Sequence, residues 1–283
     1  MNNFDFLIIG SSGLLGSRIV KVLKKNKVTL FTVARDNSNF NLNLNYFKKL
    51  NKLFVEKKFK IVINCAAIVD INYCEKEKYN AMKVNTKFVK YLSQKSKILD
   101  FKLVQISTDH VYKGEKKILN KETSKIFGIN NYAKTKVKAE KYLLNLKKFL
   151  IIRTNFTGKK KNSFIDWLIN NIRKKKHMCL FNDMYTSTLD VDTCAKLIIK
   201  LSMAKSKGIF NLGTREMISK EKFAINVSKL LGKKINYESI SCDVQKVPRG
   251  KNLGLDVSKI EKKLGYKMPT LNKSIINLLK EYQ

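Results

Sequence analysis

Short runs of apolar residues alternate with longer amphipathic segments through the first half of this sequence. The apolar runs have the length of buried strands and lack a polar face, which is typical of parallel strands covered on both sides. The predicted strands cover residues 4–9, 28–34, 60–67, 103–107 and 149–153; the predicted helices follow residue 16 and cover roughly 75–97 and 130–148, with residues 40–58 Asn-rich and then helical. This alternation predicts a doubly wound parallel α/β sheet of the Rossmann type.

The pattern loosens after Arg153. Helices are predicted around Trp167 and over residues 191–203, 220–231, 258–264 and 271–282, with short strands at 178–181 and 209–212. We expect the strand at 209–212 to return to the main sheet. The chain therefore divides into an NAD(P)-binding domain, residues 1–155 with a returning segment near 190–213, and a smaller α/β substrate-binding lobe, residues 156–283.

The chain of 283 residues carries a formal charge of +36. A polyanion-binding surface is one interpretation, and compositional drift is the other. Only six of the 58 basic residues are arginines, and the remaining 52 lysines are spread over the whole sequence, the profile that AT-rich codons give. Proteins that read nucleic acid favour Arg for bidentate contacts. We therefore predict no nucleic-acid partner, although the spread-out charge attracts anionic small molecules such as nucleotides.

The five cysteines are odd in number and form no Cys-x-x-Cys pair, and there are only two histidines. This usage predicts neither a disulfide framework nor a metal site, and it fits a reducing cytoplasm. The opening apolar run is too short for a signal peptide. No apolar stretch approaches the roughly 20 residues of a membrane span. We expect a cytoplasmic protein without a membrane span.

A glycine-rich loop joins the first predicted strand to the first helix. In this context Gly10 permits a tight turn, Gly13 lets the backbone approach a pyrophosphate, and Gly16 lets the helix pack closely on the strand. The free amides of the helix N-terminus favour phosphate oxygens. A tight turn without a ligand is the alternative. The predicted cofactor-binding residues of this loop are Gly10, Ser11, Ser12, Gly13, Leu14, Leu15 and Gly16.

The ends of the second and third predicted strands also concern the cofactor. Arg35 follows the second strand, where a cation would pair with the 2′-phosphate of NADP, while Asp36 keeps NAD open. Ala66 and Ala67 end the third strand. Side chains this small let a cofactor lie across the strand end; tight packing under a helix is the alternative.

A candidate proton-transfer group lies further along the chain. Thr108 and Asp109 follow the strand at 103–107, at the edge where open α/β sheets bind ligands. On the next helix Tyr132 and Lys136 are four residues apart and share one face. A Tyr hydroxyl has a pKa of about 10, and a neighbouring ammonium lowers it, so the pair suits a general acid while Thr108 polarises the same substrate oxygen. In a lysine-rich chain this spacing alone also arises by chance.

The order of these motifs resembles that of extended short-chain dehydrogenases/reductases, and among them the dTDP-4-dehydrorhamnose reductase family. The matching stretches run nearly from end to end: 10–16, 63–67, 84–85, 107–112, 132–136 with 139–140, 153–154, 183, 186–188, 248–249 and 255–256. The resemblance implies reduction of the 4-keto group of a nucleotide-linked deoxysugar by NADPH or NADH, in the biosynthesis of a cell-surface polysaccharide. It leaves open the nucleotide, the sugar and the assembly, a homodimer included.

The resemblance also implies roles, carried over residue by residue. Tyr132 matches the family's proton donor, Lys136 the lysine that lowers its pKa and holds the nicotinamide ribose, and Thr108 the hydroxyl that hydrogen-bonds the ketone. Tyr132 would thus protonate the alkoxide as it develops. The remaining matches are Asn85 on the cofactor side and, on the substrate side, Asp109 in a supporting role and Arg249 as a phosphate partner.

Two departures fall in the implied substrate pocket. His110 stands where the family usually has Tyr, and Phe156 where it usually has Trp. Both are candidate substrate contacts, and both put the identity of the sugar in doubt. A purely structural role is the alternative for His110. The acidic residue often found after the second strand is replaced by Asn41 or Asn43.

Three other functions compete with the reductase. A sugar-nucleotide 4,6-dehydratase has Glu at the position of His110, so its usual proton acceptor is missing here. An NAD-dependent 4-epimerase keeps its cofactor tightly bound, and Arg35 argues weakly against NAD. A catalytically silent regulatory relative keeps the fold, but such a chain often loses the Tyr or the Lys that are both present here.

Overall fold

The computed structural model describes residues 2–115, 117–161 and 163–283. Contacts between residues divide the chain into two compact units. Unit 1 comprises Met1–Ser107, Asn130–Ile152 and Ala195–Ile209, and unit 2 comprises Thr108–Ile129, Arg153–Cys194 and Phe210–Gln283. Residues 108–129, which the sequence places in the nucleotide-binding domain, therefore belong to unit 2 by their contacts.

A seven-stranded sheet in the order β11-β6-β5-β4-β1-β2-β3 is the frame of unit 1. The pairs from β3 through to β6 are all parallel. The strands are β1 (Asn2–Ile9), β2 (Leu30–Ala34), β3 (Phe40–Asn41), β4 (Lys57–Asn64), β5 (Lys102–Ile106), β6 (Phe149–Thr154) and β11 (Gly208–Leu212). β11, the strand expected to return to the sheet, forms its edge beside β6.

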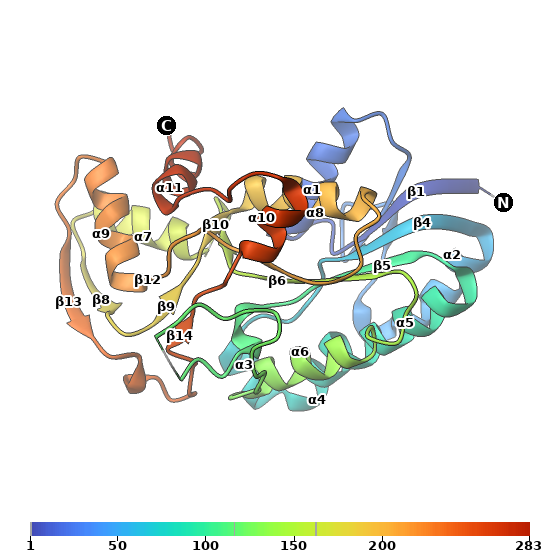
Figure 1. Ribbon diagram of the computed structural model, residues 1–283, viewed down its shortest axis with the longest axis horizontal. Coiled ribbons are helices and arrows are strands. Elements are labelled where there is room, and N and C mark those ends of the chain that lie inside the picture. The colour runs from blue at the N-terminus through green and yellow to red at the C-terminus, as the bar shows by residue number, and fades with distance from the viewer. Residues whose placement is uncertain (1, 116, 162) are drawn as a thin grey trace. The chain divides into compact units, whose positions relative to one another are not determined.

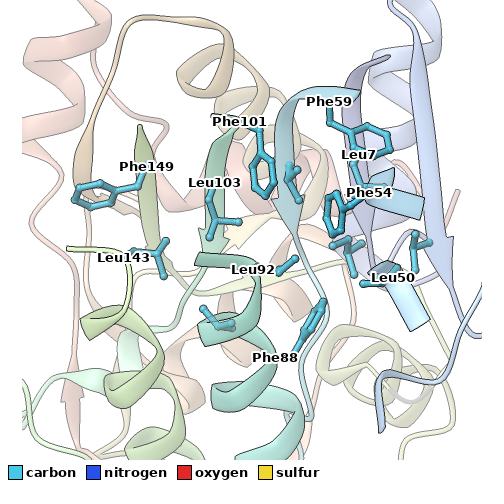
Figure 2. Close-up of a cluster of buried hydrophobic side chains, with 14 of the residues drawn as sticks. Leu7, Leu50, Phe54, Phe59, Phe88, Leu92, Phe101, Leu103, Leu143 and Phe149 are labelled. Carbon is cyan, nitrogen blue, oxygen red and sulfur yellow. The ribbon is translucent and has the colours of Figure 1, made fainter. Parts of the chain in front are cut away.

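Helices cover both faces of this sheet (Figure 1). α5 (Phe88–Leu99) and α6 (Asn131–Lys141) lie on one face, and α1 (Leu14–Lys25) and α8 (Val191–Met203) lie on the other. Side chains of a strand point alternately to the two faces, so every second residue of β1 faces each layer. The apolar core on the α5–α6 side also contains side chains from α2 (Leu50–Glu56) (Figure 2). The predicted doubly wound α/β fold is confirmed.

The single helix predicted over residues 75–97 is wrong. The chain forms α3 (Ile71–Lys76) and α4 (Lys78–Met82), then a π-helical turn, Lys83–Lys87, that leads into α5. Glu77 separates α3 from α4 because its φ of −108° and ψ of 55° are not helical. A π turn inserts one residue and re-aims a side chain, and here Asn85 bonds the backbone of Ile68. The helix predicted over residues 130–148 likewise ends early, as α6 at Lys141.

Unit 2 consists of small sheets and helices. β9 (Tyr185–Thr186) lies between antiparallel β12 (Ile218–Ser219) and parallel β14 (Asn252–Leu253). The parallel pairs are β8 (His177–Phe181) with β13 (Asn236–Ile240) and β7 (Phe156–Thr157) with β10 (Leu189–Asp190). The helices are α7 (Phe164–Arg173), α9 (Lys220–Leu230), α10 (Ser258–Leu264) and α11 (Leu271–Leu279), of which α7, α9 and α11 share one apolar core. Strands of two residues carry no periodic pattern, so the sequence did not predict them.

Short 3-10 turns cover Leu44–Lys49, Asp109–Val111 and Cys242–Val244. The second of these turns begins shortly after β5. Thr108 is its N-cap and Asp109 its first residue, so both lie in a short turn rather than a long loop. Across residues 2–115, 117–161 and 163–283, no helix has both the length and the apolar character needed to cross a membrane.

Candidate active site

The glycine-rich loop between β1 and α1 leaves no space for side chains at two of its glycines. Gly10 has a φ of +82°, and a Cβ there would lie 2.8 Å from the amide nitrogen of Ala66. A Cβ on Gly16 would overlap the carbonyl oxygen of Gly10. The amides of Gly10 and Ser11 both donate to the carbonyl of Val33, at 2.8 and 3.2 Å, which fastens the loop to β2.

The first turn of α1 is open to an anion. Gly13 is the N-cap, and no described side chain caps the helix there. The amides at the start of a helix have no partner within the helix, and the helix dipole favours negative charge at this end. Gly13 therefore places no side chain over these amides, and the approach of a cofactor pyrophosphate to them stays a prediction.

Two strand ends flank the loop. Arg35 and Asp36 follow β2 and are both exposed, so either is accessible to a ligand. Ala66 and Ala67 follow β4 and are half-buried. Sequence analysis missed the buried Asn64, which donates to Gln105 at 2.8 Å and accepts from the amide of Ala66 at 3.1 Å. This pair fixes the backbone beside Gly10. The sequence feature that could have revealed this pair is a polar residue near the end of each of two adjacent apolar strands.

Asn85 uses its amide group to join two segments of unit 1. Its oxygen accepts from the amide of Ile68 at 2.8 Å, and its nitrogen donates to the Ile68 carbonyl at 2.9 Å and to Thr135 Oγ1 at 3.1 Å. Asn85 thereby ties the chain after β4 to α6. These bonds give it a positioning role, and its predicted contact with the cofactor stays a prediction.

Tyr132 and Lys136 lie one turn apart on α6, and both are buried. Asn130 starts this helix, since its side chain accepts from the amide of Ala133 at 2.9 Å. Lys136 is 3% exposed, and its Nζ donates to the carbonyl of Ile106 at 2.7 Å, at the end of β5. The ammonium thus has one fixed partner and further N–H groups for a ligand.

Burial sets the protonation of Lys136. It lowers the pKa of Lys136 to about 8, against the opposing attraction of the Glu140 carboxylate and of Cys65. Glu140 is itself held by Ser107, whose Oγ donates to it at 2.5 Å. At neutral pH the lysine is therefore protonated, as a partner for a tyrosine acid and a ribose requires.

Thr108 and Asp109 are the first two residues of unit 2, and their side chains belong to a series of hydrogen bonds. Thr108 Oγ1 accepts from the amide of His110 at 3.2 Å and donates to Asp109 at 3.1 Å. Asn155 donates to the second Asp109 oxygen at 2.8 Å and accepts from Thr188 at 2.9 Å. Asp109 therefore holds the hydroxyl of Thr108 in this structure, and its supporting role in the reaction stays a prediction.

The other predicted substrate residues also lie in unit 2. His110 is half-buried, and burial lowers its pKa; Asp109 opposes this effect, while Arg249 and Lys220 add to it. The imidazole is therefore neutral at pH 7. Phe156 is half-buried on β7. Arg249 lines a cavity of about 510 Å³ together with lysines 113, 246 and 251.

A buried polar network in unit 2 went unrecognised in the sequence. Arg153 donates to the hydroxyl of Tyr112 and to the carbonyl of Glu122, both at 3.0 Å. Tyr112 donates in turn to Asn211 at 2.7 Å. Burial raises the pKa of Tyr112 to about 12, so its hydroxyl stays a donor. Tyr112 and Arg153, which match the family motifs, therefore stabilise the fold of unit 2 through these hydrogen bonds.

Two groups of side chains bring three donor atoms each within 4.8 Å of one another in the described part of the chain: His177, Cys179 and Glu238, and Asp183, Cys242 and Asp243. Lys251 pairs with both carboxylates of the second group, at 3.0 and 2.5 Å. Both carboxylates of that group therefore already pair with a protein cation. The absence of a metal site stays a prediction.

Comparison with known proteins agrees with this geometry. A family model described as the RmlD substrate binding domain matches residues 4–283. The probable low-salt glycan biosynthesis reductase of Haloferax volcanii is 23% identical over 96% of each chain. A dTDP-4-dehydrorhamnose reductase ortholog of Clostridium acetobutylicum is 26% identical with a TM-score of 0.90 over 99% of each chain.

The fold is also that of the dTDP-4-dehydrorhamnose reductase of Bacillus anthracis, solved in complex with NADP. That structure has a TM-score of 0.89 at 22% identity, covering 99% of this chain and 100% of its own. The family model spans both units and all the candidate site residues. The chain belongs to the RmlD substrate binding domain family, which confirms the family expected from its motifs.

Proposed function

We propose that this protein reduces the 4-keto group of a nucleotide-linked deoxysugar with a reduced nicotinamide cofactor. The observation that carries the proposal is the pair on α6. Tyr132 and Lys136 are buried one turn apart, and the Lys136 ammonium is fixed on the Ile106 carbonyl. The similarity to proteins named dTDP-4-dehydrorhamnose reductase supports the choice of substrate class.

Three residues of the candidate site have defined tasks in the proposed reaction. The bound cofactor supplies a hydride to the carbonyl carbon. Tyr132 donates its phenolic proton to the carbonyl oxygen, so the ketone becomes an alcohol without a free alkoxide. Lys136 holds the cofactor ribose and favours the phenolate that Tyr132 leaves behind. Thr108 donates a hydrogen bond to the same oxygen, which requires its hydroxyl to turn away from Asp109.

NADPH is the cofactor we favour. Arg35 is exposed at the end of β2, where a cation suits the 2′-phosphate. The Bacillus anthracis structure contains NADP. The neighbouring Asp36 would suit the ribose hydroxyls of NADH, so both cofactors belong in the test.

We place this reaction in the cytoplasm and in the synthesis of a cell-surface polysaccharide. All five cysteines are free, which suits a reducing compartment. The Haloferax volcanii relative is named for glycan biosynthesis. Nucleotide-linked sugars are the activated building blocks of such polymers.

The test is to mix the purified protein with dTDP-4-keto-6-deoxyhexoses and NADPH or NADH, and to follow the absorbance of the reduced nicotinamide. We expect oxidation that depends on the keto-sugar, with NADPH preferred. The proposal fails if no dTDP-, UDP- or GDP-linked keto-sugar is reduced while NAD stays bound through purification, which would favour a 4-epimerase.

A further inference from the structure

Lys220 is a half-buried cation to which the proposed reaction assigns no task. It is the first residue of α9, and its backbone amide donates to the carbonyl of Met184 at 3.0 Å. Its Nζ lies 5.1 Å from the centre of the Phe164 ring. Within the described residues, that ammonium makes no hydrogen bond and no ion pair. Burial lowers the pKa of Lys220 to about 8, against the opposing attraction of Asp109, so an ammonium at this position favours an anionic ligand.

The small sheet around β9 brings Lys220 and the segment that carries Arg249 to the same end of the sheet, on the two sides of β9. β12 runs antiparallel to β9, with Ser219 opposite Tyr185, so β12 ends beside the start of β9. β14 runs parallel to β9, with Asn252 opposite Tyr185, so β14 begins there too. Lys220 directly follows β12, and Arg249 precedes β14 by three positions.

Electrostatic effects link Lys220 and Arg249 to the turn that carries Asp109 and His110. Lys220 and Arg249 both act on His110, whose pKa is lowered by each of them in addition to burial. Asp109 is the carboxylate that acts on Lys220. Lys220 and Arg249 are therefore two cations, and Asp109 a carboxylate, whose charges all act in the surroundings of His110.

The segment before β14 is held in place independently of any ligand. Asp183, which precedes β9, accepts from the Ser241 hydroxyl at 2.6 Å and from the Cys242 amide at 2.8 Å, and it pairs with Lys251 at 3.0 Å. These bonds hold the pKa of Asp183 well below its usual range. The backbone that carries Arg249 is thus anchored at both ends of the stretch from Ser241 to Lys251.

We propose that Lys220 binds an oxygen of the substrate diphosphate, with Arg249 as the second cation. Two cations at the same end of this small sheet match the two negative charges of a nucleotide-linked diphosphate. A compact ammonium suits a single phosphate oxygen, and a guanidinium suits a bidentate contact. This inference rests on the proposed function, because that function supplies the nucleotide-linked substrate. The other source of an anionic oxygen would be a carboxylate on the sugar.

The experiment measures the binding of dTDP, UDP and GDP, which carry the diphosphate without a sugar, by calorimetry. We expect Lys220→Met to raise the Kd of the best of these ligands by about tenfold or more, and Lys220→Arg to restore most of the loss. The matched control is Lys222→Met, since Lys222 is exposed on the same helix. NADP binding keeps its wild-type value in all three variants, and none of them melts at a lower temperature than the wild type.

Three outcomes overturn the inference. The first is that wild-type protein binds none of the three diphosphates. The second is that Lys220→Met binds them as tightly as Lys222→Met does. The third is that only the KM of a keto-sugar acid rises in Lys220→Met, which would assign the lysine to a sugar carboxylate. Lys220-dependent dTDP binding without any keto-sugar reduction would instead uphold this inference and refute the proposed reaction.

Discussion

Units 1 and 2 fix their candidate site residues by different physical means. In unit 1 these residues follow the ends of parallel strands whose other side chains form an apolar core (Figure 2). The glycine-rich loop there is shaped by close backbone contact between Gly10, Gly16 and Ala66. In unit 2 the strands are short, and hydrogen bonds among buried polar side chains connect Thr108 to Thr188 through Asp109 and Asn155.

This difference determines what a substitution does in each unit. In unit 1 the backbone carries the shape of the glycine-rich loop, so added volume there is harmful. In unit 2 the shape depends on polar partners far apart in sequence, so removing one leaves others buried and unsatisfied. The following predictions test this contrast, from the largest expected effect to the smallest.

Replacement of the proposed acid should have the largest effect. Tyr132→Phe removes the proton donor from unit 1 and should lower kcat by about 10²- to 10⁴-fold. NADPH affinity and the KM for the keto-sugar should change little, because the ring remains. Steady-state kinetics and calorimetry measure both. Tyr142→Phe is the matched control, since Tyr142 follows α6 and is exposed; equal activity of the two variants would exclude Tyr132 as the acid.

Removal of a buried cation from unit 2 should have the next largest effect. Arg153→Met breaks the hydrogen bonds to Tyr112 and to the Glu122 carbonyl, and Arg153 is only 2% exposed. We expect a loss of about 3 kcal/mol in the free energy of unfolding, measured in urea. Arg173→Met, on an exposed arginine that bonds one carbonyl, should cost far less. Similar losses for the two variants would contradict the network.

The contrast between the units also explains what the sequence could predict. In unit 1 the strand, glycine loop and helix are adjacent in sequence, so residue spacing alone located Gly10, Gly13 and Gly16. The Tyr132–Lys136 pair is equally local, since both residues lie on one helix. The π turn at Lys83–Lys87 was not predictable in this way, because it carries Asn85, whose partner Ile68 is 17 positions away.

Unit 2 was much less predictable because its polar contacts are distant in sequence. Tyr112 bonds Asn211 across 99 positions, and Asn155 bonds Asp109 across 46. Lys220 looked like one more lysine among 52. Only the pairing of β12 and β14 with β9 reveals that Lys220 lies at the same end of this sheet as the Arg249 segment. The family resemblance pointed to several of these residues but did not indicate their hydrogen-bond partners.

Two glycines of unit 1 should separate shape from binding. Gly16→Ala places a methyl group against the Gly10 carbonyl, and overpacking of this kind costs about 1–3 kcal/mol of stability. Gly13→Ala meets only that same oxygen, at 3.1 Å. We expect Gly13→Ala to keep most of its stability and to lose NADPH affinity, because its methyl group faces the phosphate approach. Thermal unfolding and NADP calorimetry test both; a reversed order of stability would refute this geometry.

The smallest effect concerns pH, and it compares one lysine in each unit. Burial lowers the pKa of both Lys136 and Lys220 to about 8. Glu140 and Cys65 act on the first lysine, and Asp109 acts on the second. Since each ammonium favours an anionic or oxygen-rich ligand, affinity should fall by about tenfold between pH 7 and 9. NADP binding should report Lys136, and diphosphate binding should report Lys220.

The stability of the ligand-free protein should change in the opposite direction over part of that range. A lysine whose pKa is lowered from 10.5 to about 8 binds fewer protons when folded, so stability rises as pH increases from 8 to 10.5. Lys136→Arg should flatten the pH dependence of NADP binding alone, and Lys220→Arg that of dTDP binding alone. If either variant flattened both profiles, the two ligands would depend on one shared group, and the separation of roles between the units would be wrong.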